Sequence, residues 1–257
     1  GAAVVVLDPN NGEIKALVSR PGFDPNWFVN GISEKNWNYI NTDPFHPMTD
    51  KAIAGEYPPG STFKIVTGSA ALEEKKVTPD ELIFDSGRHW LVNAGGEALG
   101  WINFKRALSA SDNVYFYEMG NRLGIDLLDQ YAEKFGFGKK TGIDLHGEAS
   151  GLIATPAYKK KVFEDEWYLG DTFNTAIGQG FTLATPMQVA EMLAAVATDG
   201  KRYKPHLMSK IINDDGSVAE RFEPQEEGSL PVSQKTLDLI QDGLRAVTEE
   251  GGTASAL

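Results

Sequence analysis

The sequence has 257 residues, of which 41% are hydrophobic and 23% charged, a formal net charge of −12 and no cysteine. This length suits one large domain or two closely packed lobes, and the composition is that of an ordinary soluble globular protein. The acidic balance argues against a nucleic-acid partner, because binding to a phosphate backbone needs basic patches. The lack of cysteine excludes disulfides, thiolate catalysis and cysteine-ligated zinc.

The chain opens on a strand pattern. Two apolar runs, 3–7 and 14–18, flank the turn-forming residues 8–12, and this arrangement predicts a β-hairpin. No apolar run approaches the length that crosses a bilayer, and Gly1-Ala2-Ala3 lacks the charged start of a signal peptide. We therefore expect an excised domain whose targeting or anchoring segment has been left off.

Residues 21–60 are rich in proline, asparagine and aromatic residues and show no sustained periodicity. They predict a long ordered connection with one short helix near residues 33–40. The connection ends at Pro58-Pro59-Gly60, after which apolar residues at helical spacing predict a helix that runs to about residue 74.

Ser61 lies at or just before the start of that helix, and Lys64, three residues on, lies on the same helical face. A serine becomes a nucleophile when a neighbouring base takes its proton. A lysine whose pKa is lowered by burial or by nearby cations can be that base. A Ser-x-x-Lys pattern is also expected about once by chance in such a chain. A helix-capping serine beside a solvated lysine is therefore the alternative.

Further along, residues 86–100 predict a loop or short hairpin, and the turn at 214–216 predicts a second hairpin of 207–212 with 217–222. The basic run Lys159-Lys160-Lys161 is followed by acidic residues and predicts a solvated surface loop. Apolar periodicity predicts further helices at 104–108, 114–123, 126–135, 185–198 and 233–250, with Asp126, Thr185 and Ser233 as caps of the last three.

A second candidate motif, Ser111-Asp112-Asn113, begins 50 positions after Ser61. A loop with a hydroxyl and an amide could bond to Lys64, relay its proton and hold a peptide substrate by its backbone. Taken alone, this motif is more typical of a helix cap. The two motifs in this order are far more specific, because Ser-x-x-Lys and Ser-Asp-Asn belong to the set shared by penicillin-binding proteins and class A β-lactamases.

On these motifs the chain resembles the transpeptidase domain of class B penicillin-binding proteins, most closely the elongation type. The resemblance covers nearly the whole length and separates the chain from β-lactamases. It implies an α/β (α+β) fold of the penicillin-binding protein/serine β-lactamase type, with an antiparallel sheet between helices and an all-helical lobe, over residues 1–257. The matching stretches outside the two motifs are Leu7-Asp8-Pro9 with Gly12, Pro21-Gly22-Phe23-Asp24-Pro25-Asn26, Tyr57-Pro58-Pro59-Gly60, Gly136-Phe137-Gly138, Thr141-Gly142-Ile143-Asp144-Leu145, Ile177-Gly178-Gln179-Gly180 and Ala184-Thr185-Pro186.

Two positions depart from the family pattern. Asp50-Lys51 stands where the resemblance implies asparagine and arginine. The third motif, Lys-Ser/Thr-Gly on a central strand, is implied shortly after a Gly-Thr-Ala like the one that begins at Gly252, and the sequence ends at Leu257. Lys140-Thr141-Gly142 matches this third motif in sequence but shows no strand pattern, so we expect it to be structural. We therefore expect a domain incomplete at its C-terminus, with three strands of a five-stranded sheet beyond residue 257.

The resemblance implies a mechanism. Ser61 attacks the carbonyl of the penultimate D-alanine of a peptidoglycan stem peptide, and Lys64 takes the serine proton. Ser111 passes a proton to the leaving D-alanine, while Asn113 bonds the substrate backbone and helps to hold Lys64. An amine from a neighbouring strand then captures the acyl-enzyme, and a β-lactam would stay attached to Ser61. Without the third motif, this chain should be a poor catalyst, because one oxyanion donor is lost.

No cofactor or metal is implied, since His46, His89, His146 and His206 are scattered and no nucleotide-binding loop is present. A Ser-His-Asp triad is disfavoured because Gly-x-Ser-x-Gly is absent. The resemblance implies peptidoglycan stem peptides and β-lactams as ligands. It also implies a membrane-anchored full-length protein with cell-wall elongation partners, at the outer face of the cytoplasmic membrane.

Two other functions remain open at this point. The first is a D,D-carboxypeptidase or β-lactamase, in which water rather than an amine resolves the acyl-enzyme. The second is a non-catalytic β-lactam sensor or scaffold that keeps the fold. The lifetime of a penicillin adduct separates the first of these from a transpeptidase, and the absence of any adduct would favour the second.

Overall fold

The computed structural model describes residues 1–87, 93 and 96–256. The predicted N-terminal hairpin is confirmed: β1 (Ala2–Leu7) pairs antiparallel with β2 (Ile14–Arg20). Gly12 closes the turn with a φ of 79°, a conformation that glycine adopts without steric cost. The inner face of β1 packs on the turn at 51–54 and on Met187 of the helix α8 (Pro186–Ala197).

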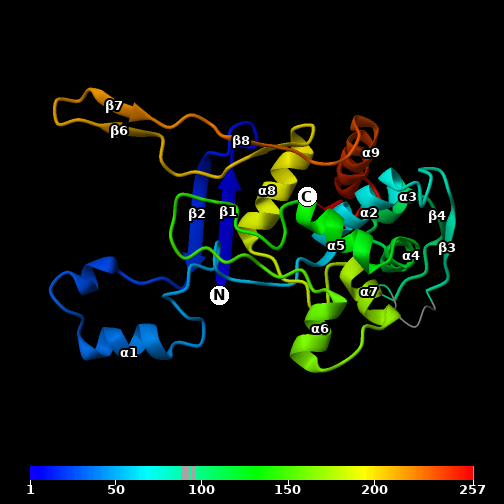
Figure 1. Cartoon of the computed structure of the whole chain (residues 1–257), viewed down its shortest axis with the longest axis horizontal. Helices are drawn as coiled ribbons and strands as arrows, with labels where there is room; N and C mark the ends of the chain where they lie inside the picture. Colours follow the sequence, from blue (N-terminus) through cyan, green and yellow to red (C-terminus); the bar gives the residue numbers. More distant parts are fainter. Residues whose placement is uncertain (88–92, 94–95, 257) are drawn as a thin grey trace.

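The connection after β2 forms a lobe that projects from one end of the molecule (Figure 1). It contains a short 3₁₀ helix at Pro25–Phe28 and the predicted helix α1 (Glu34–Thr42). Ser33 caps α1, because its side chain accepts a hydrogen bond from the N–H of Asn36. The short-helix prediction near residues 33–40 is therefore confirmed.

The helix α2 (Lys64–Glu73) lies at the centre of a helical body (Figure 1), and every residue from Lys64 to Ala71 is buried. A helix that is buried all round must be enclosed by other elements. The helices packed around α2 or onto its neighbours are α3 (Phe104–Ser109), α4 (Asn113–Leu123), α5 (Ile125–Lys134), α7 (Leu169–Ala176) and α9 (Gln234–Arg245).

α8 joins the two regions, because it packs on β1 at one side and on α9 at the other. Its start is the predicted one: Thr185 and Gln188 form a reciprocal capping box, and Pro186 is the first helical residue. The α/β (α+β) class, with antiparallel strands beside a helical body, is confirmed. The short strands, all paired antiparallel, are β3 (Ile83–Asp85) with β4 (Gly100–Ile102), β5 (Lys201–Tyr203) with β8 (Glu226–Ser229), and β6 (Lys210–Ile212) with β7 (Val218–Arg221).

The loop prediction for Lys159-Lys160-Lys161 is wrong, although Lys160 and Lys161 are exposed as predicted. These residues belong to α6 (Pro156–Phe163), and Lys159 is only 5% exposed. Its Nζ lies 2.9 Å from a carboxylate oxygen of Asp165 and 2.9 Å from one of Asp171. A lysine can be buried when it is paired in this way, and the acid from α7 that completes the pairing cannot be recognised from local pattern.

Two smaller expectations also differ. Asp126 does not cap α5, because the helix begins at Ile125, directly after Gly124, and Asp126 lies in its first turn. A carboxylate is still favourable there, near the positive end of the helix. The loop expected at 86–100 contains residues 88–92 and 94–95, which lie outside the described residues; β3 precedes it and β4 begins at its last residue.

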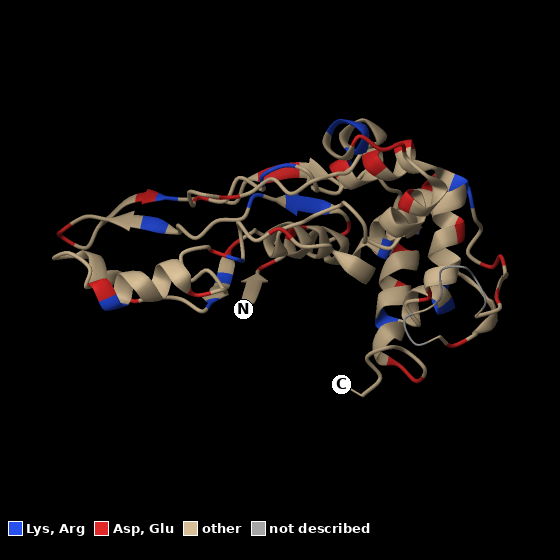
Figure 2. Ribbon diagram, turned by 90° about the horizontal axis from the view of Figure 1, so that it is seen from below, with Lys and Arg blue, Asp and Glu red and all other residues tan. Residues whose placement is uncertain are grey.

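Acidic and basic residues are interspersed along the described ribbon (Figure 2). Within the described ranges, no helix combines the length and the apolar character needed to span a membrane. After α9 the chain ends in a 3₁₀ turn (Ala246–Thr248) and a bend that docks on α3, where Arg106 donates to the carbonyl of Gly251 at 2.6 Å.

Candidate active site

Ser61 lies in the 3₁₀ turn Gly60–Phe63, which runs directly into α2. Its side chain is exposed, and the N-cap positions of the turn and of α2 belong to Pro59 and Phe63, neither with a side-chain capping bond. Ser61 is therefore not the helix cap that was the alternative interpretation. It presents its hydroxyl at the positive end of a buried helix.

Backbone contacts from a distant segment fix this turn. The N–H of Gly60 donates to the carbonyl of Gly178 at 2.8 Å, and Tyr57 exchanges two backbone hydrogen bonds with Ala184. Gly178 has a φ of 70°, and a Cβ there would lie 2.2 Å from the Gly60 carbonyl oxygen. The stretches 177–180 and 184–186, which match the family pattern in the sequence, thus contact the turn that carries Ser61 and hold it in place.

Lys64 is 1% exposed and points its ammonium at the start of α4. Its Nζ donates to the carbonyl and the Oγ of Ser111, at 2.7 and 3.0 Å, and to Oδ1 of Asn113 at 2.6 Å. The ring of Phe116 lies 5.6 Å away. Burial lowers the pKa of Lys64 from 10.5 to about 8, although the negative charge of Asp112 raises it.

This pKa changes what Lys64 can do at neutral pH. With a pKa of about 8, roughly a tenth of the side chain is a neutral amine at pH 7, against roughly three in ten thousand for an ordinary lysine. The neutral amine is the form that accepts a proton. Lys64 is therefore suited to be a general base.

Ser111 bridges Ser61 and Lys64. Its Oγ lies 3.0 Å from Ser61 Oγ and 3.0 Å from Lys64 Nζ, both hydrogen-bonding distances. Among the described residues no hydrogen bond joins Ser61 directly to Lys64, so Ser111 links them. The structure thus brings together all four predicted site residues, Ser61, Lys64, Ser111 and Asn113.

Asp112 acts as a helix cap and at the same time orients the catalytic loop, so both interpretations of its motif apply. Its carboxylate caps α4 by accepting from the N–H of Tyr115 at 2.6 Å, and it is 1% exposed. Because Asp112 holds the helix start, the neighbouring Ser111 and Asn113 side chains face Lys64. The helix cap and the hydrogen-bonding loop are one structure.

Lys140-Thr141-Gly142 lies in no strand and serves the loop that contains it. The N–H and hydroxyl of Thr141 donate to Oε1 of Glu148 at 2.7 and 2.6 Å, and the N–H of Gly142 donates to Oε2 at 3.1 Å. Thr141 is buried and Lys140 is exposed. These contacts support the structural interpretation of the three residues.

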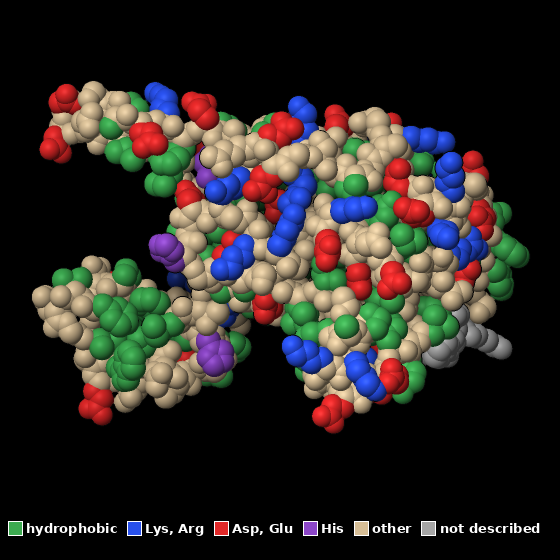
Figure 3. Space-filling model, in the orientation of Figure 1, with side chains coloured by type: hydrophobic (Ala, Val, Ile, Leu, Met, Phe, Trp, Pro, Cys, Tyr) green, Lys and Arg blue, Asp and Glu red, His purple; other side chains and the backbone are tan. Residues whose placement is uncertain are grey.

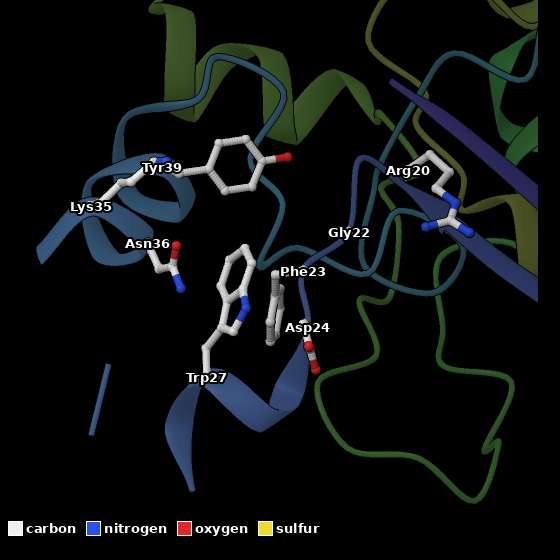
Figure 4. Close-up of a pocket in the computed structure, with 8 residues that line it drawn as sticks. All are labelled: Arg20, Gly22, Phe23, Asp24, Trp27, Lys35, Asn36 and Tyr39. Atoms are coloured by element: carbon white, nitrogen blue, oxygen red, sulfur yellow. The ribbon is translucent and has the colours of Figure 1, made fainter. Parts of the chain in front are cut away.

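A separate cavity of about 560 Å³ lies in the α1 lobe, lined by Phe23, Trp27 and Tyr39 among others (Figure 4). None of its lining residues belongs to the cluster around Ser61. The lobe also exposes hydrophobic side chains (Figure 3), namely Phe28, Val29, Trp37, Phe45 and Met48. In the described part of the chain, no three or more His, Asp and Glu side chains form a group that could hold a metal ion, and His89 lies outside that part.

A serine at the start of a buried helix, a lysine one turn on and a second serine joining them are typical of a Ser-x-x-Lys acyl-transfer domain. The family model of the penicillin binding protein transpeptidase domain matches residues 2–256, and the chain belongs to this family. The family predicted from the two motifs is therefore confirmed.

The similar proteins agree in sequence and in fold. Peptidoglycan D,D-transpeptidase MrdA of Escherichia coli (strain K12) is 38% identical over 263 residues, which cover 98% of this chain. PBP2 of Pseudomonas aeruginosa, solved with WCK 5153, superposes with a TM-score of 0.86 at 33% identity and covers 99% of this chain and 59% of that one. PBP2 of Helicobacter pylori, solved with MreC, gives a TM-score of 0.86 at 32% identity, with coverages of 99% and 47%.

The relatives are longer than this chain. It spans 41% of the length of the Escherichia coli protein. It spans 35% of the corresponding protein of Haemophilus influenzae, to which it is 38% identical over 228 residues, 86% of this chain.

Proposed function

We propose that this chain is the transpeptidase unit of a peptidoglycan D,D-transpeptidase that works through a serine acyl-enzyme and is inhibited by β-lactams. The observation that carries the proposal is the continuous link from exposed Ser61 through Ser111 to buried Lys64, with both separations at 3.0 Å. The names of the similar proteins support the same activity.

In the acylation step, Ser61 Oγ bonds to the carbonyl carbon of the penultimate D-alanine of a stem peptide. Its proton moves to Ser111 Oγ as the Ser111 proton moves to the neutral amine of Lys64, so Ser111 remains a hydroxyl and Lys64 becomes an ammonium. The tetrahedral intermediate then collapses, the peptide bond to the terminal D-alanine breaks, and a proton returns from Lys64 through Ser111 to the leaving amine.

Two further groups support this step. Asn113 holds the Lys64 ammonium through Oδ1, and in this mechanism it also bonds the backbone of the donor peptide. The backbone N–H of Ser61, at the start of α2, is one donor to the oxyanion. We do not assign the second oxyanion donor to residues 140–142, because they lie in no strand and Thr141 and Gly142 bond to Glu148.

An amine from a second stem peptide attacks the acyl-enzyme and forms the cross-link, whereas a β-lactam leaves a stable adduct on Ser61. By analogy with the PBP2 that was solved in complex with MreC, the whole protein would assemble with cell-wall elongation partners. It would act at the outer face of the cytoplasmic membrane, where stem peptides are accessible.

The test is to map a labelled penicillin on the full-length protein that contains this chain. We expect one adduct, on the peptide that carries Ser61, which persists for many times the acylation time and disappears in Ser61→Ala. Rapid release of hydrolysed penicillin would instead indicate a carboxypeptidase or β-lactamase. A wild-type protein that is never labelled would indicate a scaffold and overturn the proposal.

A further inference from the structure

Ser111 has an unusual backbone conformation for a residue with a Cβ. Its φ is 54°, in the left-handed region that non-glycine residues seldom adopt. The turn closes the C-terminus of α3, where the N–H of Ser111 donates to the carbonyl of Leu108 at 3.1 Å and the N–H of Asp112 donates to that of Ala107 at 2.9 Å. Here it brings the hydroxyl of Ser111 between Ser61 and Lys64, so whatever holds this turn also holds the proton path.

Asn93 forms hydrogen bonds to both residues that follow Ser111. Its Oδ1 accepts from the backbone N–H of Asn113 at 2.6 Å, and its Nδ2 donates to Oδ2 of Asp112 at 2.9 Å. These bonds come from a segment 20 residues away in the sequence, between β3 and β4. No local feature of the Ser-Asp-Asn motif could supply them.

Asp85 anchors Asn93 in turn. It ends β3, is 1% exposed, and its Oδ2 accepts from Asn93 Nδ2 at 2.9 Å. The same carboxylate accepts from the N–H groups of Gly87 and Leu99, at 2.8 Å each, and so fixes both sides of the connection that carries Asn93. Asn93 is therefore tied to the end of β3.

The chemistry of this position requires an asparagine. Two buried carboxylates, Asp85 and Asp112, need donors between them, and the N–H of Asn113 needs an acceptor on the same side. A side-chain amide provides both in one plane, since its NH₂ group donates and its oxygen accepts. Leucine would provide neither. Aspartate would keep the acceptor but place a third carboxyl against two others.

We propose that Asn93 is a positioning residue of this site: by joining Asp85 to Asp112 and to the Asn113 N–H, it holds the two residues that follow the left-handed turn and so keeps Ser111 Oγ between Ser61 and Lys64. The inference rests on the proposed function, because it concerns the same acylation step. It adds a residue that neither motif contains and that touches neither the nucleophile nor the base.

The surroundings allow this role to be separated from folding. Asn93, Ser111 and Asp112 line a cavity of about 430 Å³ that the bend at 251–253 closes on one side. Since Asn93 is only half-buried, water can replace its lost hydrogen bonds. The cost of substitution therefore falls on the geometry of the turn. Among the described residues, the ionisable groups that face the network are Lys64 from α2, Asp85 from β3, Asp112 and Tyr117 at α4, and Glu97 and Arg106 at the cavity wall.

The first test is Asn93→Leu in the full-length protein. We expect the rate constant of acylation by a labelled penicillin to fall about 10- to 100-fold, as for a displaced catalytic group, while the melting temperature changes little. Hydrogen exchange of the Asn113 amide should speed up, because its acceptor is gone. Asn121→Leu, on the exposed side of α4, is the matched control and should acylate like the wild type.

The second test is Asn93→Asp, which also serves if the leucine variant does not fold. Only the protonated carboxyl can donate to Asp85 or Asp112, so the acylation rate relative to wild type should rise as the pH is lowered. A merely structural role would give a ratio independent of pH. Wild-type acylation with unchanged rates in both Asn93 variants overturns the positioning role alone, whereas a wild type that is never acylated overturns the proposed function.

Discussion

Replacing Lys64 by methionine should lower the acylation rate constant for penicillin by about a thousandfold, within the range typical of a lost general base. Methionine fills a similar volume without a proton acceptor. Ser111 Oγ keeps its contact with Ser61, but the proton that it receives has no further destination. The measurement is the pseudo-first-order rate of adduct formation at about pH 8 over a range of penicillin concentrations, which separates acylation from binding.

The matched control for this variant is Lys140→Met. Lys140 belongs to the Lys-Thr-Gly triplet that matches the third motif in sequence, but its side chain is exposed and its neighbour Thr141 is bonded to Glu148. We expect acylation by this variant to stay within about twofold of the wild type, as is usual for a surface substitution. If Lys140→Met loses activity and Lys64→Met keeps it, the base has been assigned to the wrong lysine.

The second large effect is expected for Gly178→Ala. The new Cβ would lie 2.2 Å from the carbonyl oxygen of Gly60 and 2.7 Å from Cβ of Phe63, at a φ of 70°. The turn that carries Ser61 must move, and a displacement of about 1 Å can cost a hundredfold in rate. We expect at least this loss in acylation, with a free energy of unfolding lowered by about 2 kcal/mol. Penicillin labelling and denaturant unfolding provide the two measurements.

Gly170→Ala is the control for that substitution. Gly170 lies in the first turn of α7, has no positive φ, and a Cβ there would meet nothing within 4 Å. Alanine is the better helix residue, so stability should be equal or slightly higher, with unchanged acylation. Equal effects at both positions would show that the contact with Gly60 is unimportant.

Signals that are local in the chain could be predicted from the sequence. The starts of α8 and α9 follow from the predicted caps Thr185 and Ser233, each of which accepts the bond that its residue type predicts. The N-terminal hairpin follows from turn residues between two apolar runs. These features depend on neighbours within a few positions.

What could not be predicted depends on contacts between distant segments. Lys159 looked solvated because its partner Asp171 belongs to a different helix. Gly178 and Asn93 belong to neither catalytic motif. The role of Gly178 follows from its close approach to Gly60, and that of Asn93 follows from its hydrogen bonds to Asp85, Asp112 and the Asn113 N–H. The prediction that Ser61 and Ser111 belong to one site also depended on the family resemblance. Taken alone, each serine could equally have marked the start of an unrelated helix.

The central claim is that a buried lysine with a lowered pKa activates Ser61 through Ser111. The most direct test is the pH dependence of Ser61 acylation by a penicillin, from about pH 6 to about pH 9. Because the neutral amine is the proton acceptor and burial lowers the pKa of Lys64 to about 8, the rate constant should rise with pH and level off above that value. Lys64→Met should remove this rise. A rate that is independent of pH in the wild type, or a rise that survives in Lys64→Met, would contradict the mechanism.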